Sequence, residues 1–437
     1  MPGAHRNEVY MDEKEQLLRF IKNGTSPFHV VETTSDILDN ANFQKLDITS
    51  EWDLVLGKNY YTTIYGTSLI AFRLGNILDD IPVLRIATAH TDSPCLRVKP
   101  NPQNISGGYL RINTELYGGA ILSTWFDRPL SIAGRVTLAS DDIFEPQSVL
   151  VDFKHALLTI PSLAIHLNKN KDKKDISVAK EMLPLIALIN DELNKDNFFL
   201  NCLAQELNIP AKDILDFDLY IYNYEVGTTL GINGEFISSP RLDNLTSVNA
   251  LIEGLSMGSR SDSINMICLY DNEEIGSRTK QGADSNITNM VLSKIFMSLG
   301  MDQSLMYSSI ASGFMLSADV AHGYHPNYPD AYDSTNHCEL GKGIVLKLNS
   351  SQRYATDSTA IASIMQLCKA YNIPYQKYAN QSDIAGGSTL GTIASAWLPM
   401  RTVDLGIPVL AMHSARELMG SEDQKSLNRL MTAFFSE

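Results

Sequence analysis

The sequence predicts an α/β fold that is interrupted by an inserted, mostly-β domain. Two observations support this prediction. Apolar runs typical of buried strands alternate with helical segments before residue 92 and after residue 233. Between them, short segments with alternating apolar and polar residues dominate, as in antiparallel sheets. We therefore expect a discontinuous α/β domain from residues 1–91 and 234–437, and an inserted domain from residues 92–233.

The first α/β segment contains a predicted helix and a predicted buried strand. Residues 12–23 carry apolar side chains at helical spacing, and Gly24 follows as a typical helix stop. Residues 81–89 (IPVLRIATA) are almost continuously apolar, which indicates a strand covered on both faces. This strand would place His90 at its C-terminal end.

The inserted region predicts strands at residues 131–139 and 148–153, where apolar and polar residues alternate. Residues 181–193 have an apolar pattern that predicts one helix. The charged run at residues 168–174 (NKNKDKK) predicts a solvated loop.

The second α/β segment supplies the remaining elements. Its helices are expected at residues 245–255 and 358–370, the first with Asn244 or Thr246 near the N-cap. Its strands are expected at residues 263–270, 310–318, 343–348 and 409–412.

Composition restricts the class of protein. The chain has 437 residues, enough for two or three domains, and its net charge is −15 from 35 basic and 50 acidic residues. An acidic chain lacks the basic surface that nucleic acids require, so we expect no nucleic-acid partner. We also expect no membrane partner, because no apolar run is long enough to span a bilayer. The five scattered cysteines and the absence of an apolar leader favour a cytoplasmic location.

Five polar clusters lie where apolar runs end or where a loop meets a helix, which is where open α/β sheets bind ligands. They contain His90, Asp243, the pair Glu273 and Glu274, Asp319, and His413. Each residue alone could be a structural group, for example an N-cap aspartate or a hydrogen-bonded histidine. Together, two histidines and three carboxylates match the ligands that zinc prefers. The residues alone leave a metal hydrolase and a set of structural groups as alternatives.

The chemistry of such a site assigns a possible task to several of these residues. Asp92, two residues after His90, could accept the proton of the second ring nitrogen and fix the tautomer. Asp243 could bridge two cations with its two oxygens. The adjacent Glu273 and Glu274 point in different directions, so one could bind metal while the other accepts a proton from water.

Beyond these residues, long segments resemble the aspartyl aminopeptidase family of co-catalytic zinc peptidases. The resemblance extends over nearly the full chain and is carried by SPFHV (26–30), AHTDSPCLRVKP (89–100), ELYGG (115–119), STWFDRPL (123–130), IPSLAIHLN (160–168), SPRLDNL (239–245), DNEEIGS (271–277), SADVAHGYHPNY (317–328), NSSQRYATD (349–357) and LAMHSARE (410–417). It implies a zinc-peptidase α/β/α catalytic domain with an inserted, mostly-β dimerisation domain. The implied function is removal of acidic N-terminal residues, Asp or Glu, from peptides by water that two zinc ions activate.

The resemblance also implies a role for each site residue. Asp243 looks like the bridging carboxylate, and Glu273 looks like the general base. His90 and Asp319 would complete one zinc site, and Glu274 and His413 the other, with cobalt or manganese as possible substitutes. Asp92 would orient His90. His166 looks like the family's catalytic histidine in the middle domain, which could steady the substrate carbonyl or the tetrahedral oxyanion. His325 looks like a residue lent to a neighbouring subunit, and Lys347 and Tyr354 lie in segments around the substrate. A cis peptide bond is implied between Asp243 and Asn244.

The family assembles as a tetrahedral dodecamer built from dimers, so the resemblance implies the same homo-oligomer here. Two segments depart from the animal pattern: Ser162 stands near a position where animal members have a histidine, and residues 382–391 (SDIAGGSTLG) look bacterial. A carboxypeptidase or a deacylase on the same metal scaffold is one alternative, and a non-catalytic binding protein is another. A free α-amine on the substrate distinguishes the aminopeptidase from the first alternative, and intact metal and base residues argue against the second.

Overall fold

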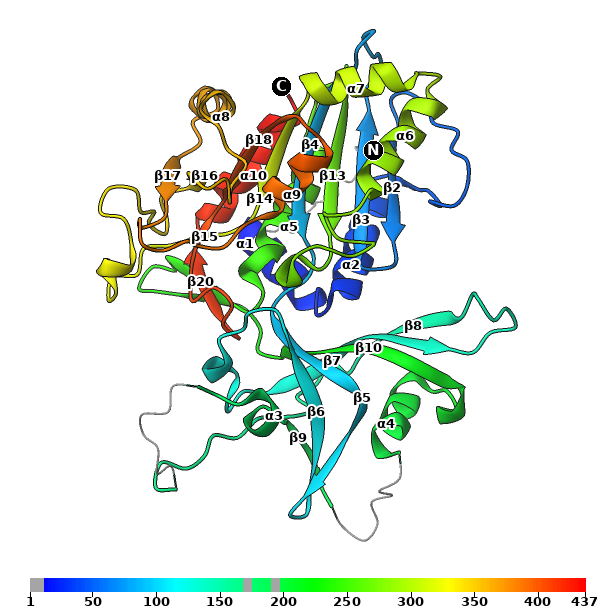
Figure 1. Cartoon of the computed structure of the whole chain (residues 1–437), viewed down its shortest axis with the longest axis vertical. Coiled ribbons are helices and arrows are strands. Elements are labelled where there is room, and N and C mark those ends of the chain that lie inside the picture. The colour runs from blue at the N-terminus through cyan, green and yellow to red at the C-terminus, as the bar shows by residue number, and fades with distance from the viewer. Residues whose placement is uncertain (1–11, 168–174, 190–196) are drawn as a thin grey trace, which may run out of the picture.

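The computed structural model describes residues 12–167, 175–189 and 197–437. Figure 1 shows an α/β body in the upper half and a separate β-sheet below it. The nine strands of the α/β sheet stand in the order β1 (Gln44–Lys45), β2 (Asn59–Ile64), β3 (Ser68–Leu74), β13 (Ser263–Tyr270), β4 (Val83–His90), β14 (Phe314–Ala318), β18 (Arg401–Gly406), β16 (Ile344–Leu348) and β17 (Tyr375–Ala379).

The central strands β13, β4, β14 and β18 run parallel to one another, so their C-terminal ends meet at one edge of the sheet. All eight residues of β13 are buried. Side chains of alternate strand residues enter different cores: Ala87 packs with one set of helices and Ile86 with the other. A continuous apolar run is the sequence pattern that such double coverage requires.

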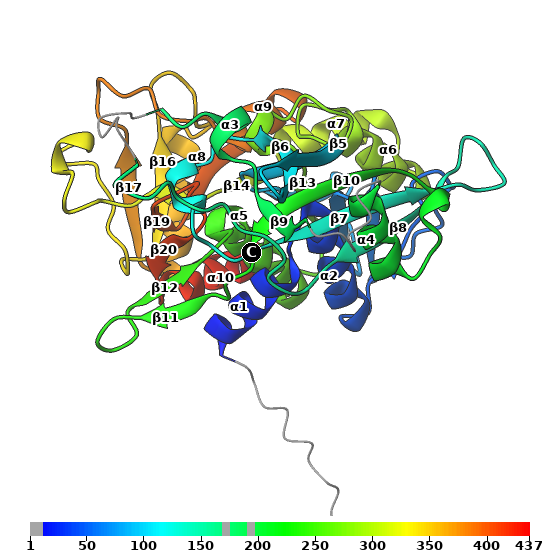
Figure 2. The same cartoon turned by 90° about the horizontal axis from the view of Figure 1, so that it is seen from below.

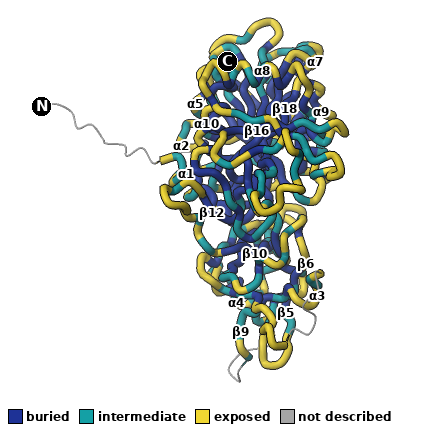
Figure 3. Tube along the Cα trace, turned by 90° about the vertical axis from the view of Figure 1, so that its left-hand side faces the viewer, coloured by how far each residue is buried: buried dark blue, intermediate teal, exposed yellow. Residues whose placement is uncertain are grey.

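Helices cover both faces of this sheet and create the two cores. One face packs against α1 (Glu13–Asn23), α2 (Pro27–Asn40), α5 (Leu242–Met257), α8 (Ser358–Ala370) and α10 (Asp423–Phe434). The other packs against α6 (Ile287–Ser298), α7 (Gln303–Ser312) and α9 (Leu390–Trp397). Figure 3 shows the buried residues concentrated inside this three-layer body. The predicted α/β/α fold is therefore confirmed.

The inserted region forms a six-stranded antiparallel sheet with a core of its own. Its strands stand in the order β8 (Gln147–Asp152), β7 (Leu130–Leu138), β10 (Ile214–Asn223), β5 (Cys95–Ser106), β6 (Tyr109–Tyr117) and β9 (Leu185–Leu188), and α3 (Val178–Glu181) and α4 (Phe198–Leu207) lie beside them. The hairpin of β7 and β8 projects from the side of the molecule, as Figures 1 and 2 both show. The connections between this sheet and the α/β body run through residues 91–94 and 224–227.

A third, five-stranded sheet supports one side of the α/β body. Its order is β11 (Thr228–Leu230), β12 (Phe236–Ser239), β20 (Glu417–Gly420), β19 (Pro408–Leu410) and β15 (Ala321–His322). Strand β19 leads into His413 and β20 begins with Glu417, so this sheet carries two residues of the candidate site. No helix among the described residues is long and apolar enough to cross a membrane.

Most elements lie where the sequence predicts them, but two predictions need correction. The helix expected at residues 181–193 is wrong: α3 ends at Glu181, and β9 pairs with β6 instead. The strand expected from residue 310 begins only at Phe314, because Ile310 belongs to α7. The predicted loop at residues 168–174 lies outside the described residues.

The helix expected at residues 245–255 lies within α5, and Asn244, whose backbone is not helical, directly precedes its regular part. The Asn244 side chain donates to the backbone carbonyl of Ala318, on the neighbouring strand β14. The Thr246 hydroxyl donates to the Leu242 carbonyl within the helix. Asn244 therefore secures the connection between helix and sheet, and neither side chain caps the helix.

Candidate active site

The C-terminal edge of the central sheet gathers four of the predicted site residues. His90 is the last residue of β4 and pairs with Tyr270, the last residue of β13. The chain after β13 turns sharply into a short 3-10 helix that carries Glu273 and Glu274. Asp319 follows the last residue of β14, which pairs with β4 in parallel. Because these strands are parallel neighbours, side chains far apart in the sequence converge at one edge.

Asp243 and His413 reach the same place from outside the central strands. Asp243 lies in the first turn of α5, where the backbone departs from helical geometry, and its peptide bond to Asn244 is cis. His413 lies just after β19 with φ near 68°. Both backbones therefore leave regular structure at the point where their side chains meet.

The distances divide the side chains into two groups around Asp243. Its Oδ1 lies 3.2 Å from His90 Nε2, which in turn lies 3.6 Å from Asp319 Oδ1. Its Oδ2 lies 3.3 Å from His413 Nε2, which lies 3.4 Å from Glu274 Oε2. Each group offers one histidine nitrogen and two carboxylate oxygens within the reach of a single cation. This is the donor set that zinc takes in proteins.

The two histidines have the tautomer that such a site needs. His90 Nδ1 donates to the Asp92 carbonyl at 3.0 Å, and His413 Nδ1 donates to the Gly119 carbonyl at 3.2 Å. In both rings Nε2 therefore faces the carboxylates and is the nitrogen that could bind a cation after losing its proton. Asp243 Oδ1 and Glu274 Oε1 are buried and accept no hydrogen bond from any described residue. Buried acceptors without a donor fit positions that a cation would occupy.

The crowded carboxylates of this group shift the pKa values of their neighbours. Burial, together with Asp319 and Asp92, raises the pKa of Glu273 to about 8. Burial and the charge of Asp243 raise the pKa of Glu274 well above its usual range. Although burial lowers the pKa of His413, its hydrogen bond to Asp243 outweighs this and raises the pKa to about 10. A divalent cation bound here would offset this acidic charge, because metal ligands bind in their deprotonated forms.

Asp92 has a larger role than orienting His90. The nearer acceptor for His90 Nδ1 is the Asp92 backbone carbonyl, while the carboxylate lies 3.4 Å away. The carboxylate instead accepts the backbone N–H groups of Glu273 at 3.2 Å and Glu274 at 3.1 Å. Asp92 therefore holds both the histidine and the acidic turn.

Glu417 supports Asp243 and His413 in the way that Asp92 supports Glu273 and Glu274, although no sequence pattern points to it. Its carboxylate is buried and accepts the backbone N–H of Asp243 at 3.0 Å and that of His413 at 2.8 Å. One side chain thus anchors the backbones of two metal-ligand candidates. A glutamate four residues after a histidine has no distinctive spacing, so only the fold reveals its role.

We expect Glu417→Ala to weaken zinc binding roughly tenfold to a hundredfold, the usual range when a group that supports metal ligands is lost. The truncation leaves two buried N–H groups without an acceptor, so both ligand backbones can shift. Competition with a chromophoric chelator measures the affinity. Glu417→Gln keeps one acceptor oxygen and should lie between wild type and Glu417→Ala. Equal affinities in all three proteins would exclude the anchoring role.

Lys347 and Tyr354 lie beside the metal-ligand candidates. Lys347 is buried, donates to the Val320 carbonyl at 3.0 Å, and places its Nζ 3.9 Å from Asp319 Oδ2. Its ammonium also lies 5.2 Å from the centre of the Tyr354 ring. The structure thus places the positively charged Lys347 side chain directly next to the acidic cluster.

His166 and His325 are not among the side chains that converge here. His166 is exposed in a turn of the inserted domain, between the exposed Ile165 and Leu167. The His325 ring packs edge-on against Tyr328 at 4.8 Å, and its Nδ1 accepts the Asn327 N–H. Neither histidine belongs to a group of potential metal ligands within the part of the chain that the structure describes.

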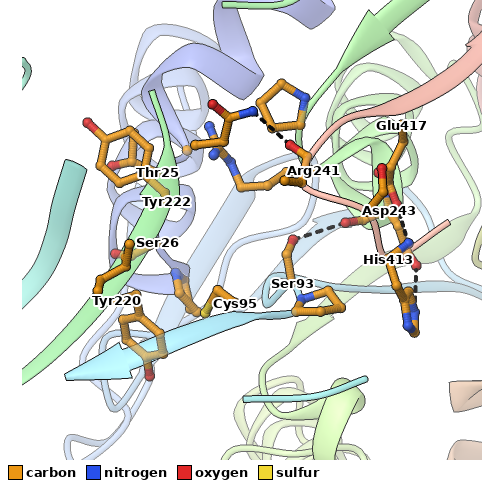
Figure 4. Close-up of a pocket in the computed structure, with 18 of the residues that line it drawn as sticks. Thr25, Ser26, Ser93, Cys95, Tyr220, Tyr222, Arg241, Asp243, His413 and Glu417 are labelled. Atoms are coloured by element: carbon orange, nitrogen blue, oxygen red, sulfur yellow. Dashed lines mark hydrogen bonds and ion pairs between the residues drawn. The ribbon is translucent and has the colours of Figure 1, made fainter. Parts of the chain in front are cut away.

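A cavity extends from the metal-ligand candidates towards the inserted sheet (Figure 4). Asp243, His413 and Glu417 lie together at one end, and Tyr220 and Tyr222 of β10 lie at the other. Ser93 also lines the cavity, and its hydroxyl donates to the Asp243 backbone carbonyl at 2.9 Å. The candidate site therefore lies against the junction of the two domains.

Comparisons with known proteins agree with this architecture. The family model described as aminopeptidase I zinc metalloprotease (M18) matches residues 20–435. The chain is 42% identical over 423 residues to a probable M18 family aminopeptidase 2 of Clostridium novyi, covering 96% of this chain and 98% of the relative.

Solved structures show the same similarity. A chain of the Ape4 and Nbr1 complex superposes with a TM-score of 0.93 and 35% identity, covering 97% of this chain and 85% of that chain. The S. cerevisiae mApe1 dodecamer gives a TM-score of 0.84 and 28% identity, with 97% and 96% covered. The chain therefore belongs to the M18 family of zinc metalloproteases and is an aminopeptidase, a hydrolase of peptides.

Proposed function

We propose that this aminopeptidase removes acidic residues from the N-termini of peptides, using two zinc ions per subunit and Glu273 as the general base. One observation carries the proposal. Two ligand candidates lie with each oxygen of Asp243: His90 and Asp319 with Oδ1, and Glu274 and His413 with Oδ2. Glu273 lies in neither of these two groups, although it forms a third group of possible ligands with His90 and Glu274. A spare carboxylate beside a two-metal donor set is what a water-activating hydrolase requires.

The residues would share the two ions as follows. His90 and Asp319 lie with Oδ1 of Asp243, and Glu274 and His413 lie with Oδ2. Zinc, when bound, lowers the pKa of water towards about 7 and polarises the scissile carbonyl. Cobalt or manganese could occupy the same donors, since affinity for N and O ligands is shared among these metals.

Glu273 would move the proton that the reaction requires. Its carboxylate takes a proton from the attacking water and returns it to the leaving amine, the usual sequence for a general base in amide hydrolysis. Asp92 fixes the backbone on which Glu273 stands.

Lys347 is our candidate for the preference for acidic residues. Its buried ammonium lies beside Asp319, where a substrate carboxylate would add a second partner. Buried charges are stable only when paired, so an acidic side chain is favoured there over an apolar or basic one. Tyr354, against the same ammonium, limits the positions Lys347 can adopt.

Substrate specificity provides the test of this proposal. Rates on Asp-, Glu-, Leu- and Lys-anilides should favour the two acidic substrates, and N-acetylated versions should be inert because an aminopeptidase requires a free amine. Lys347→Met should reduce the ratio of Glu to Leu cleavage by roughly tenfold or more, the effect of losing a buried ion pair. The ratio cancels any general damage to Asp319. Faster cleavage of Leu than of Glu by the wild-type enzyme would refute the acidic preference.

We also propose that the chain assembles as a homo-oligomer through its inserted domain, a dodecamer built from dimers. Two observations support this: the similar mApe1 forms a dodecamer, and the inserted domain exposes several large apolar side chains. These are Ile143 and Phe144 at the tip of the β7–β8 hairpin, and Leu163, Ile165 and Leu167 beside His166. In that assembly His325 would serve a neighbouring subunit's site, and His166 would contact the substrate from the inserted domain. A solution mass of 48.4 kDa, that of one chain, would rule the assembly out.

The cysteines support the cytoplasmic location that we propose. All five are free thiols, and four of them are buried. Free thiols persist in reducing compartments, whereas extracellular proteins of this size often form disulfides.

A further inference from the structure

Tyr117 joins the inserted sheet to the turn that carries Glu273. It is the last residue of β6, and its hydroxyl donates to Asp92 Oδ2 at 2.8 Å. The same hydroxyl accepts a hydrogen bond from Asn272 Nδ2 at 2.9 Å. All three residues are buried, with exposed fractions of 5%, 0% and 7% for Tyr117, Asp92 and Asn272. A phenol of the inserted domain thus bridges two groups of the α/β body.

Both partners of Tyr117 control the backbone at Glu273. The Asp92 carboxylate accepts the N–H groups of Glu273 and Glu274. Asn272 directly precedes Glu273 and has a left-handed backbone with φ of 64°. Its side-chain oxygen accepts a hydrogen bond from the Thr279 hydroxyl at 2.9 Å, which closes the turn from the other side. The position of Glu273 therefore depends on two anchors, and Tyr117 contacts both.

The hydroxyl, not the ring, makes this connection. The Tyr117 ring packs edge-on against Tyr220 at 5.8 Å, within the core of the inserted domain. Burial and the nearby charge of Asp92 keep the pKa of the phenol far above its usual value, so the group remains a donor at any working pH. Replacement by Phe would preserve the packing and remove only the two hydrogen bonds.

We infer that Tyr117 is a positioning residue for Glu273, acting from the inserted domain through Asp92 and Asn272. This inference rests on the proposed role of Glu273 as the general base. Groups in an active site must be held within about 0.5 Å of their productive positions, and hydrogen bonds behind them supply that rigidity. Loss of the Tyr117 hydroxyl frees the Asn272 side chain and one side of the Asp92 carboxylate, so the turn can relax.

The test measures kcat, KM and zinc content of Tyr117→Phe on the best anilide substrate. We expect kcat to fall roughly tenfold to a hundredfold, the range for losing a hydrogen bond to a charged group. KM should stay within about twofold and zinc content should not change, because no ligand is touched. The matched control is Tyr61→Phe, which removes the hydroxyl of another buried tyrosine that donates to Asp39 at 2.8 Å, away from the site. It should leave kcat unchanged.

A double-mutant cycle tests whether Tyr117 influences kcat through Asn272. Asn272→Gly keeps the left-handed backbone, which glycine adopts freely, and removes the side chain that Tyr117 holds. If both residues act on the same turn, the double variant should lose less kcat than the product of the two single losses. A multiplicative loss would overturn the coupling.

Other outcomes are equally decisive. Equal kcat values for Tyr117→Phe and Tyr61→Phe, or a loss of kcat that follows a loss of zinc, would overturn the positioning role. Failure of the proposed function is recognised separately, because Glu273→Gln would then retain activity whatever Tyr117→Phe does.

Discussion

Glu273→Gln is expected to bind zinc like the wild type and to lose at least about a hundredfold in kcat. General bases contribute about 10²–10⁴-fold to catalysis, and the amide of Gln can neither accept nor return the proton. The substitution preserves shape and leaves both groups around Asp243 intact. The measurements are metal content by elemental analysis and steady-state rates on a glutamyl anilide.

The adjacent Glu274→Gln provides the matched comparison. It makes the same chemical change one residue away, but in a side chain that lies 3.4 Å from His413 Nε2. We expect this variant to lose zinc from the group formed with His413 and to recover partly in excess zinc. Near-normal rates for Glu273→Gln, or loss of zinc from it, would show that the two glutamates have been assigned the wrong way round.

Asp243→Asn should have the second large effect. Asp243 contributes one oxygen to the group with His90 and Asp319 and the other to the group with Glu274 and His413. An amide has one oxygen and no charge, so it cannot bridge two cations. Zinc content should fall at both positions. Activity should fall about a thousandfold, which corresponds to the several kcal/mol that a metal supplies to the transition state.

Asp319→Asn is the control for this prediction, since Asp319 lies only with His90 and Asp243. It should lose the ion held with His90 and keep the one held with His413. The two variants would be indistinguishable in zinc content if Asp243 served only one ion, and that result would contradict the bridging arrangement.

The sequence predicts the central strands and the convergence of the polar residues at their ends, for physical reasons. Strands β4 and β13 are covered on both faces, so their sequences are almost continuously apolar. Parallel strands place their C-terminal ends together, so the positions of His90, Glu274 and Asp319 after apolar runs suffice to group them. Resemblance to a family then divides these residues into ligands and base, which composition and spacing cannot do.

The rest depends on contacts that no local pattern reveals. Residues 185–188 have an apolar pattern that a helix also allows, and only the available edge of β6 makes them a strand. Tyr117 and Glu417 act through hydrogen bonds to residues far away in the sequence. A tyrosine or glutamate of this kind looks like any other until the chain is folded.

The way the inserted sheet is connected has a consequence for how the chain folds. His90 and Asp243 meet in space, yet the whole inserted domain separates them in sequence. The first and last strands of that domain, β5 and β10, are direct antiparallel neighbours, with Leu96 opposite Ile221. Once they pair, the chain path from His90 to Asp243 shortens about fivefold, which lowers the entropic cost of bringing them together by about 1.5 kcal/mol. Early folding of the insert would therefore speed assembly of the α/β body, and slow folding of the insert would delay it.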